Sequence, residues 1–579
     1  MRPASSLIAH LGLVALCWIS PWDNVRGQVA TILHPFGNGT ALPQGTPANQ
    51  DGTSPATALI QGRDGNFYGT TSSGGTNGTG TAFAITPQGG VTILHNFGDA
   101  TVTNDGLHPN AALIQGSGND TNFYGTTSSG GANGAGTAFA MTPRGGVTIL
   151  HSFGDNTVLD TRGNPATDGV SPAAALIQSR DGNFYGTTTS GGTNTTGTAF
   201  VMTPGGIVTI LHNFGDGTVS NDGLNPSAGL IQGKGSDTNF YGTAPGGGTN
   251  GKGTVFAMTP LGIVTILHHF GGSAVDVNGS AATDGTFPAS GLIQDSGNNT
   301  NFYGTTLNGG AAHKGTAFAM TPLGAVTILH GFGGATDGTF PVAGLTQGND
   351  GNFYGTTSGG GFAGNGVAFE VTPRGGETIL HSFGDGTALN PDGSTATDGT
   401  TPTAGLIQGS DGNFYGVTTG GGAGSNLNSS GPVGATFKLT IDISSSPQTF
   451  SEWADSYKIT VDAAATPQND GIPNLLKYLC DINPTTSTSA TERAALPSLS
   501  TTSVGGFVYL TLTYRQNLAE TGITIHVQTS PDLQTWTTLN PPDLCRQVST
   551  DSTTGDPIME VGVKITGADQ FIRLNATSP

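Results

Sequence analysis

The feature that most constrains the fold is a group of short sequence words that recurs seven times in one order. Each unit reads D-G-x-x-P, an apolar word that is usually LIQ, NFYG, a Gly-rich loop, a run like AFAITP and TILHxFG. Each unit therefore holds four short apolar runs separated by turn signals, with no helical periodicity. The tyrosines of NFYG mark the period of 51 to 62 residues: Tyr68, Tyr124, Tyr185, Tyr241, Tyr303, Tyr354 and Tyr415.

Four antiparallel strands in a unit of this length indicate a blade of a β-propeller. The first unit shows the pattern, because Asp64-Gly65 is a hairpin signal between two of its apolar runs. Isolated four-stranded sheets would expose apolar faces and edges, and stacking them around an axis buries the faces. A parallel β-helix is the alternative, but its coils are usually shorter and lack a tight hairpin. The sequence therefore predicts an all-β, seven-bladed propeller over residues 28–443.

The first strand-like segment, VATILHPFG (29–37), has no preceding hairpin to supply its partner. The seventh unit shows the complementary defect, because it stops at ATFKLTI (435–441) with no TILH word after it. We therefore predict that residues 29–36 pair antiparallel with 435–441 as the fourth strand of blade seven. This pairing would close the ring.

The first 27 residues differ from the repeats and have the layout of a secretory signal peptide. Arg2 precedes the apolar run 7–19, which is short for a membrane span, and a mature chain would begin at Gln28. A membrane anchor is the alternative. We expect a secreted or cell-surface protein of the bacterial envelope, with no membrane span after signal removal.

Composition excludes some partners. Charged residues make up 10% of the chain and the net charge is −20, without a Lys/Arg cluster. Electrostatic attraction to nucleic acid or to an anionic membrane is therefore not expected.

After a predicted linker at 444–449, residues 450–579 have a different composition and indicate a small C-terminal accessory domain, α+β or β-sandwich. Residues 470–484 are predicted to be helical. Asp470 and Asn474 resemble part of a calcium loop, but the first two carboxylates are missing, so a turn into the helix is preferred and no cofactor is assigned. Cys480 and Cys545 are the two cysteines after the signal segment, and we predict a disulfide between them.

The words DGNFYGTT, AFAMTP and TILHSF resemble the GloVer tandem repeat, named for Gloeobacter and Verrucomicrobia. The resemblance covers roughly residues 29–442 and implies an exported, "choice-of-anchor" type of bacterial protein. It implies no reaction and no catalytic residues. The C-terminal segment resembles a domain found on large exported verrucomicrobial proteins.

Polar residues that recur in every unit are interpreted as structural, because a catalytic residue is needed only once. The TILHxFG histidine is expected between blades, hydrogen-bonded, on the strand face shared by Val91, Ile93 and Phe97. The D-G-x-x-P aspartates are expected to make turns rather than to bind Ca²⁺. The two sets are His34, His95, His151, His212, His268, His330 and His381, and Asp51, Asp105, Asp168, Asp222, Asp284, Asp337 and Asp398.

The connections fall into two classes. If the strands of a unit are called A to D, the short A–B and C–D turns share one face of the ring, and the long B–C and D–A connections share the other. We name the latter the loop face. We expect ligand binding there, since long loops on a rigid scaffold commonly bind. We also expect the loop face to be acidic, because the D-G-x-x-P aspartates lie on it.

A ligand site is sought where the repeat symmetry breaks. Residues 28–445 contain no Trp, and few Phe lie outside the repeated words. Five departures gather on the loops of two neighbouring blades and form a candidate ligand patch: Phe287, Phe340, Phe362, His313 and Lys314.

Two classes of function fit. We favour a non-catalytic exported propeller with a binding, adhesion or structural role, whose partner is an extracellular glycan or protein. The alternative is a propeller hydrolase or lyase acting on polysaccharide, which needs asymmetric acid and base groups. Asp160, Asp276 and Asp295 are asymmetric carboxylates, but they lie scattered among loops with no paired motif.

Overall fold

The structure is a computed structural model that describes residues 29–37, 51–296, 300–334, 336–422 and 433–440, together with seven strands between 498 and 577. The chain divides into two compact units, one of which spans Gly27–Ile441. Among the described residues, no helix is long and apolar enough to cross a membrane.

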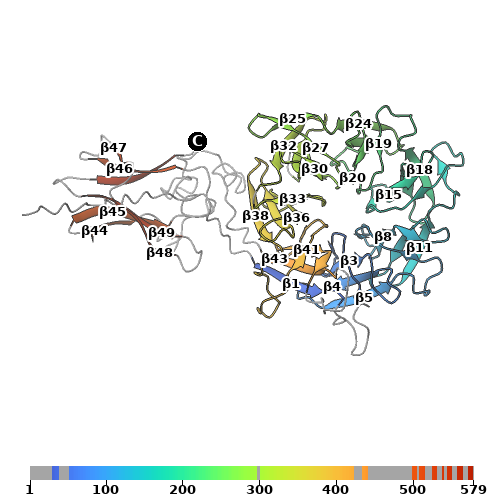
Figure 1. The fold of residues 1–579 in the computed structure, drawn as a ribbon, viewed down its shortest axis with the longest axis horizontal. Helices are drawn as coiled ribbons and strands as arrows, with labels where there is room; N and C mark the ends of the chain where they lie inside the picture. Colours follow the sequence, from blue (N-terminus) through green and yellow to red (C-terminus); the bar gives the residue numbers. More distant parts are fainter. Residues whose placement is uncertain are drawn as a thin grey trace, which may run out of the picture. The chain divides into compact units, whose positions relative to one another are not determined.

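The larger unit is a ring of seven antiparallel sheets, as predicted (Figure 1). Blade 1 contains β2 (Ile60–Gln61), β3 (Phe67–Thr71), β4 (Thr81–Ile85) and β5 (Val91–Asn96). Blade 2 contains β7 (Ile114–Gln115), β8 (Phe123–Thr127), β10 (Thr137–Met141) and β11 (Val147–Ser152). Blade 3 contains β14 (Ile177–Gln178), β15 (Phe184–Thr188), β17 (Thr198–Met202) and β18 (Val208–Asn213).

The remaining blades repeat this order of strands. Blade 4 contains β20 (Ile231–Gln232), β21 (Phe240–Ala244), β23 (Thr254–Met258) and β24 (Val264–His269). Blade 5 contains β28 (Ile293–Gln294), β29 (Phe302–Thr306), β31 (Thr316–Met320) and β32 (Val326–Gly331). Blade 6 contains β34 (Thr346–Gln347), β35 (Phe353–Thr357), β37 (Val367–Val371) and β38 (Glu377–Ser382). Blade 7 contains β40 (Ile407–Gln408), β41 (Phe414–Thr418), β43 (Ala435–Thr440) and β1 (Val29–Pro35).

The N-terminal strand closes the ring, as predicted. β1 pairs antiparallel with β43, from Val29 opposite Thr440 to Pro35 opposite Ala435. The blue N-terminal strand lies beside the orange strands of blade 7 in Figure 1. Leu33 and Phe36 of this segment are buried in the core between blades 7 and 1. The first and last strands of the propeller thus form one sheet, which removes the open end of the array.

The cores lie between neighbouring sheets rather than inside one sheet. In the core of blades 1 and 2, Tyr68 and Phe97 pack with Phe123 and Phe139. The NFYG words make one ring contact at each of the seven junctions, with the Tyr of one blade 4.0–4.4 Å from the Phe of the next, centroid to centroid. Such aromatic pairs contribute about 0.5–1.5 kcal/mol each beyond their buried area. The aromatic residues of the repeated words therefore stabilise the packing of each blade against the next.

A β-bulge in strand D corrects one prediction. In blade 1, Ile93 is opposite Phe83 but His95 is opposite Ala82, so Leu94 is an extra residue in the ladder. An extra residue reverses the faces that follow it. Val91 and Ile93 therefore face the core shared with blade 7, whereas His95 and Phe97 face blade 2. The prediction that all four share one face was wrong, because alternation was counted through the bulge.

Two sets of hydrogen bonds join the strand A regions around the ring. The LIQ glutamine of each blade accepts from a backbone N–H in the A–B turn of the preceding blade, at 2.6–3.2 Å, and Gln61 closes the circle by accepting from Ser410. In six blades, a FYGTT threonine donates to a carbonyl of the next blade, as Thr70 does to Pro109. Blade 7 has Val417 at this position.

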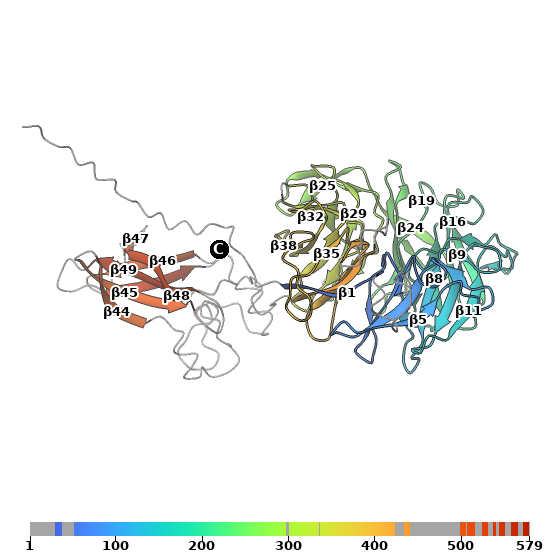
Figure 2. The same cartoon turned by 60° about the horizontal axis from the view of Figure 1, so that its bottom comes forward.

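Two long D–A connections add a further strand to the outer edge of the following blade, and a third adds a single β-bridge there. β12 (Leu159–Asp160) pairs parallel with β18, and β25 (Ser273–Asp276) pairs parallel with β32 and antiparallel with β26 (Ala281–Thr283). β25 lies outside β32 in both views (Figures 1 and 2). Leu389 makes the equivalent parallel bridge to Thr31 of β1. These loops therefore cover exposed strand edges, which would otherwise be open to pairing with another chain.

On the loop face, the D–A connection that leads into a blade pairs with the B–C loop of that same blade. This pairing confirms that the two long connections share one face. The pairs are β6 (Gly106–Leu107) with β9 (Ser129–Gly130), β13 (Gly169–Val170) with β16 (Ser190–Gly191), β19 (Gly223–Leu224) with β22 (Gly246–Gly247), β27 (Gly285–Thr286) with β30 (Asn308–Gly309), β33 (Gly338–Thr339) with β36 (Gly359–Gly360), and β39 (Gly399–Thr400) with β42 (Gly420–Gly421).

The described part of the C-terminal unit consists of two antiparallel sheets. One has the order β44 (Ser498–Val504), β45 (Phe507–Arg515), β49 (Pro557–Lys564) and β48 (Leu544–Thr550). The other has the order β47 (Thr537–Leu539), β46 (Thr524–Ser530) and β50 (Phe571–Thr577). The predicted signal segment, linker and helix at 470–484 lie outside the described residues.

Closure can be tested by removing the N-terminal strand. We expect that deletion of residues 28–37 lowers the melting temperature sharply, because β43 loses its partner and Phe36 leaves the core. A synthetic peptide of residues 29–37 should restore the melting temperature as its concentration rises, since ligands of the native state stabilise it. Calorimetry with and without peptide measures this, and a scrambled peptide is the control. A deletion variant with unchanged stability would argue against closure of the ring by β1.

Candidate binding surface

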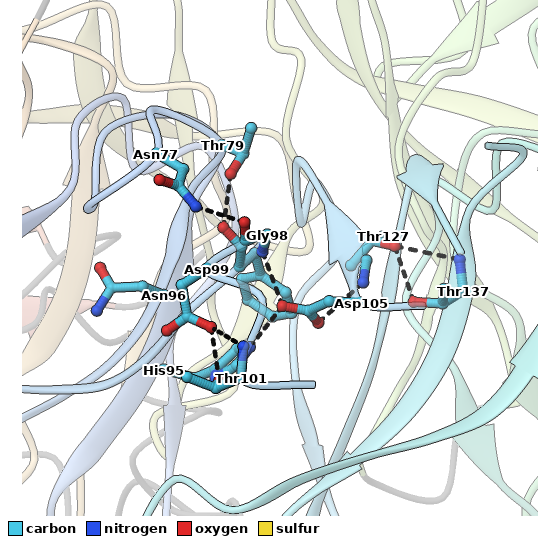
Figure 3. Close-up of polar contacts among 12 residues, drawn as sticks. Asn77, Thr79, His95, Asn96, Gly98, Asp99, Thr101, Asp105, Thr127 and Thr137 are labelled. Carbon is cyan, nitrogen blue, oxygen red and sulfur yellow. Dashed lines mark hydrogen bonds and ion pairs between the residues drawn. The ribbon is translucent and has the colours of Figure 1, made fainter. Parts of the chain in front are cut away.

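Each junction between blades contains a histidine–aspartate pair. At the junction of blades 1 and 2, His95 Nε2 lies 3.0 Å from Asp105 Oδ2 (Figure 3). The Asp105 carboxylate also accepts from two backbone amides, Gly98 N–H at 2.7 Å and Gly106 N–H at 2.9 Å. The His95 ring packs edge-on against Phe97 at 4.8 Å. The pair therefore fixes the end of strand D of one blade to the start of the next blade.

The D-G-x-x-P word follows from this geometry. Aspartate supplies the two acceptor oxygens. Glycine follows it because a Cβ at Gly106 would stand 2.3 Å from Thr127 Oγ1, which itself bonds Thr137 Oγ1 at 2.9 Å (Figure 3). Pro109 Cδ would lie 2.7 Å from a Cβ on Gly80 of the preceding blade, so the proline packs against that blade's B–C loop. The residues of D-G-x-x-P therefore connect one blade to the next.

All seven histidine–aspartate distances fall between 2.8 and 3.2 Å. The aspartate side chains are at most 10% exposed. The prediction of hydrogen-bonded histidines between blades is confirmed. The argument for an acidic loop face was wrong, because these carboxylates are buried against donors and do not contribute to the surface.

In six of the blades, the NFYG tyrosine forms a second repeated pair with an aspartate on the short-turn face. Tyr68 donates to Asp64 Oδ2 at 2.8 Å, and Asp64 also accepts from Asn66. Burial and the hydrogen bond to Asp64 raise the pKa of Tyr68 to about 12. The equivalent pairs raise the pKa of Tyr124 and Tyr241 to about 12 as well. These tyrosines are therefore structural donors and not acids near neutral pH.

The predicted patch residues lie on the loop face of blades 5 and 6. Phe287 and Phe340 occupy equivalent positions in two neighbouring D–A connections, both with φ of 59°. The backbone N–H of Phe287 donates to the Lys252 carbonyl at 2.8 Å, and that of Phe340 to the Lys314 carbonyl at 2.7 Å. Phe287 is 37% exposed and Phe340 is half-buried.

The same two lysines lie over these two rings. Lys252 Nζ is 5.6 Å from the centroid of the Phe287 ring, and Lys314 Nζ is 4.7 Å from that of Phe340. Both distances are within the range of cation–π attraction. The left-handed φ is not specific to these residues, because Ser54, His108 and Thr401 at the equivalent positions share it. What distinguishes blades 5 and 6 is the aromatic–lysine pair.

Sequence reasoning included Lys314 but missed Lys252, which lies in the B–C loop of blade 4. The signal was present, since Lys252 stands one residue before the loop-ending glycine, as Lys314 does. His313 and Phe362 sit on the same face, in the B–C loops of blades 5 and 6, and Phe362 is 83% exposed. The backbone N–H of Phe362 donates to Ser382 Oγ at 2.7 Å, and the two aromatic–lysine pairs are formed without it, so Phe362 borders the patch.

The asymmetric carboxylates do not come together as an acid–base pair. Asp160 and Asp276 end the added edge strands β12 and β25, where each caps a turn by accepting from backbone N–H groups. Asp295 lies on the opposite, short-turn side, where its Oδ1 accepts from Gln347 at 3.1 Å. The glycosidase alternative therefore gains no support from these three residues.

Blade 6 contains two acidic residues that sequence reasoning missed. Glu370 and Glu377 are the only glutamates between residues 28 and 442. Glu370 is buried and accepts from Asn352 at 2.7 Å. Glu377 stands where blades 1 to 5 have valine and lies 3.5 Å from His330 Nε2. A comparison of the repeated words position by position would have found both.

The two predicted features of the C-terminal domain remain predictions. Asp470, Asn474 and Cys480 lie outside the described residues, and so does the side chain of Cys545, whose backbone belongs to β48.

The fold and its repeated junctions define a closed, seven-bladed β-propeller built from tandem repeats. The Gloeobacter/Verrucomicrobia repeat family matches residues 32–230, 156–298 and 274–426. These overlapping matches cover more than half of the chain, and the chain belongs to this family. No curated protein matches it.

The chain has distant likenesses among solved structures. A polysaccharide lyase, an ulvan lyase bound to its saccharide, has a TM-score of 0.32 at 11% identity, over 62% of this chain and 87% of that one. A sialidase from Trypanosoma rangeli in complex with sialic acid has a TM-score of 0.30 at 9% identity, over 95% of each chain. Likenesses this distant do not decide ligand or reaction.

One junction can be tested by truncating its aspartate. Asp105→Ala should lower the free energy of unfolding by about 2–4 kcal/mol, because Gly98 N–H, Gly106 N–H and His95 lose a buried acceptor. Asp99→Ala is the matched control, since Asp99 lies in the same connection (Figure 3) and its hydrogen bonds to Thr101 are exposed. Chemical denaturation measures both. Equal, small losses would show that the pair does not hold the junction.

The raised tyrosine pKa values predict the alkaline limit of the fold. A pKa raised in the folded state gives stability that is complete below the unfolded value of about 10 and is lost as pH rises through the folded value. Stability should therefore fall between about pH 10 and about pH 12, as Tyr68, Tyr124 and Tyr241 ionise. Tyrosinate absorbance during a pH titration measures the ionisation, and Asp64→Asn should shift the Tyr68 step to lower pH. Propeller tyrosines that all titrate near 10 would contradict the assignment.

Proposed function

We propose that this propeller is a non-catalytic binding module whose ligand is an extracellular glycan, held on the loop face by the two aromatic–lysine pairs, Lys252–Phe287 and Lys314–Phe340. The observation that carries the proposal is the repetition of one pair in two neighbouring blades, at equivalent positions. The other described blades place Ser54, His108, Ser171, Asn225 and Thr401 there.

The chemistry of the pair favours a sugar ligand. An aromatic ring offers an apolar face to the C–H side of a sugar ring, and Phe287 is exposed enough to do so. The lysine ammonium offers three hydrogen-bond donors and a positive charge to hydroxyl or acidic groups. Because two such pairs occupy adjacent blades, they fit successive units of a polymer better than a single small molecule. We infer a preference for acidic polysaccharides.

A non-catalytic role agrees with the chemistry of the described residues. The recurring histidines, aspartates and tyrosines are engaged in the blade junctions and turns. Asp160 and Asp276 cap exposed turns.

The place of action is proposed to be outside the cytoplasm, at the cell surface or in the surroundings. The resemblance of residues 1–27 to a signal peptide supports this. We also infer that the two sheets of the C-terminal unit form a small β-sandwich with an accessory role.

The binding proposal is tested with a panel of neutral, uronate-containing and sulfated polysaccharides. We expect retention of the mature protein on an acidic member of the panel without new reducing ends. The double variant Phe287→Ser with Phe340→Ser should weaken that binding by about 10- to 30-fold, because it removes both apolar platforms. Lys252→Ala with Lys314→Ala should weaken binding and reduce its dependence on salt.

The matched control is Leu323→Ser, because Leu323 is an exposed apolar residue, 93% accessible, on a C–D turn of the opposite face. It should bind like the parent protein. Full affinity in the double phenylalanine variant would contradict the patch. Release of shortened or unsaturated fragments would overturn the non-catalytic assignment and support a hydrolase or a lyase.

A further inference from the structure

The junction of blades 5 and 6 carries an acidic third side chain that comes from strand D itself, Glu377. Two other junctions also have an acidic third residue near the pair, but Asp155 and Asp385 lie in the loop after strand D, where each already accepts from a threonine N–H and hydroxyl. At the position of Glu377, strand D has Ala30 in blade 7 and valine in blades 1 to 5: Val91, Val147, Val208, Val264 and Val326. In those blades this side chain packs against the core shared with the preceding blade. In blade 6 it places a carboxyl group next to the His330–Asp337 pair.

We propose that His330, Asp337 and Glu377 form a binding site for a divalent transition-metal ion, with zinc the best match. His330 Nε2 lies 3.0 Å from Asp337 Oδ2 and 3.5 Å from Glu377 Oε2. One ligand atom from each residue can be chosen so that all three lie within 4.8 Å of one another. Bonds of about 2.0–2.2 Å in a tetrahedral arrangement separate ligand atoms by roughly 3.3–3.6 Å. The three side chains therefore approach the spacing of zinc ligands before any ion is considered.

The donor set also fits zinc better than calcium. Imidazole nitrogen with two carboxylates is a ligand set that zinc and its neighbours accept, whereas Ca²⁺ takes six to eight oxygens. Asp337 is already oriented as a ligand, since its Oδ2 accepts from Gly333 N–H at 2.9 Å and its Oδ1 from Gly338 N–H at 2.6 Å. Fixed second partners of this kind hold a metal ligand in place.

An unsatisfied atom supplies a second reason. Glu377 Oε1 is buried and has no hydrogen-bond partner, while Oε2 faces His330. A buried polar oxygen left unpaired costs about 1–3 kcal/mol, so the substitution of glutamate for valine needs a compensation. Coordination of an ion by the Glu377 carboxylate would supply it, because the cation offsets the burial of both acidic groups.

The junction is also the most open of the seven. The side chains of His330 and Asp337 are 20% and 10% exposed, whereas those of the His95–Asp105 pair are 5% and 4% exposed. An ion can therefore reach this pair more easily. The site would join strand D of blade 5 to strand D of blade 6, and its expected effect is to strengthen that junction.

The competing explanation needs no metal. Burial, with the hydrogen bond to Asp337 and the charge on Asp337, raises the pKa of Glu377 to about 9. Burial also acts to raise the pKa of Asp337, but hydrogen bonds from His330 and Glu377 outweigh it and lower that pKa to about 2. A neutral Glu377 donating to Asp337 would thus be stable near pH 7. The two explanations differ in what zinc does to the protein.

The test measures zinc binding by the chelator-treated protein at neutral pH, by titration calorimetry and by the change in melting temperature. Zinc chloride should bind at one site in the propeller and raise the melting temperature. Binding should release protons, because metal ligands must be deprotonated, and the heat should therefore depend on the buffer. Cobalt(II) in place of zinc should give a visible absorption band of a tetrahedral site.

The matched variant is Glu377→Val, which restores the residue of blades 1 to 5 and is expected to fold. It should lose zinc affinity by about 100-fold or more, together with the thermal shift. Val326→Glu is the converse variant, since it places a carboxyl group next to the equivalent His268–Asp284 pair, and it should add a second zinc site. Binding that survives Glu377→Val would refute the site, as would a parent protein that neither binds zinc nor gains stability from it.

Discussion

The junction between consecutive blades is the interaction on which the rest of the structure depends. A single propeller sheet has two apolar faces, and the bulge at Leu94 and its equivalents lets one strand serve both of them. Before the bulge, strand D packs toward the preceding blade, and after it the histidine and phenylalanine pack toward the following one. Each blade is therefore complete only between two neighbours, which explains why the first and last strands must share a sheet. An open array would leave one such junction exposed.

Much of this arrangement could be predicted from the sequence, because repetition multiplies a weak local signal. Blade number, strand order and the closing role of residues 29–36 follow from counting words. The bulge could not be found in that way, since alternation read along a strand assumes that every residue has a partner. The edge strands β12 and β25 were also missed, because their parallel pairing joins residues about 50 positions apart, as Leu159 joins Thr209. The connections that contain these edge strands were expected to bind a ligand only because they are long.

The candidate site, like the fold, could be predicted only in part from the sequence. Phe287, Phe340, His313 and Lys314 could be selected because they interrupt repeated words or loops. Lys252 could not be tied to Phe287 by sequence, since the contact crosses from the loop of one blade to the connection of the next. Glu377 could have been found by comparing the repeated words, but its role could not. It replaces valine inside a word, and only the structure shows that this position faces the His330–Asp337 pair.

The departures from symmetry converge on one part of the ring. Phe340 lies three residues after Asp337 in the connection that leads into blade 6, so the aromatic–lysine pair and the Glu377 cluster share one junction. A ring with six other equivalent junctions can tolerate the replacement of valine by glutamate at one junction. The loss of packing from a buried carboxyl group, of the order of 1–3 kcal/mol, is confined to one interface, while the closing strand and the remaining histidine–aspartate pairs hold the circle. A repeat protein can therefore place a specific site in one blade junction without rebuilding its fold, and the blade 5–6 junction is where we propose that this chain does so.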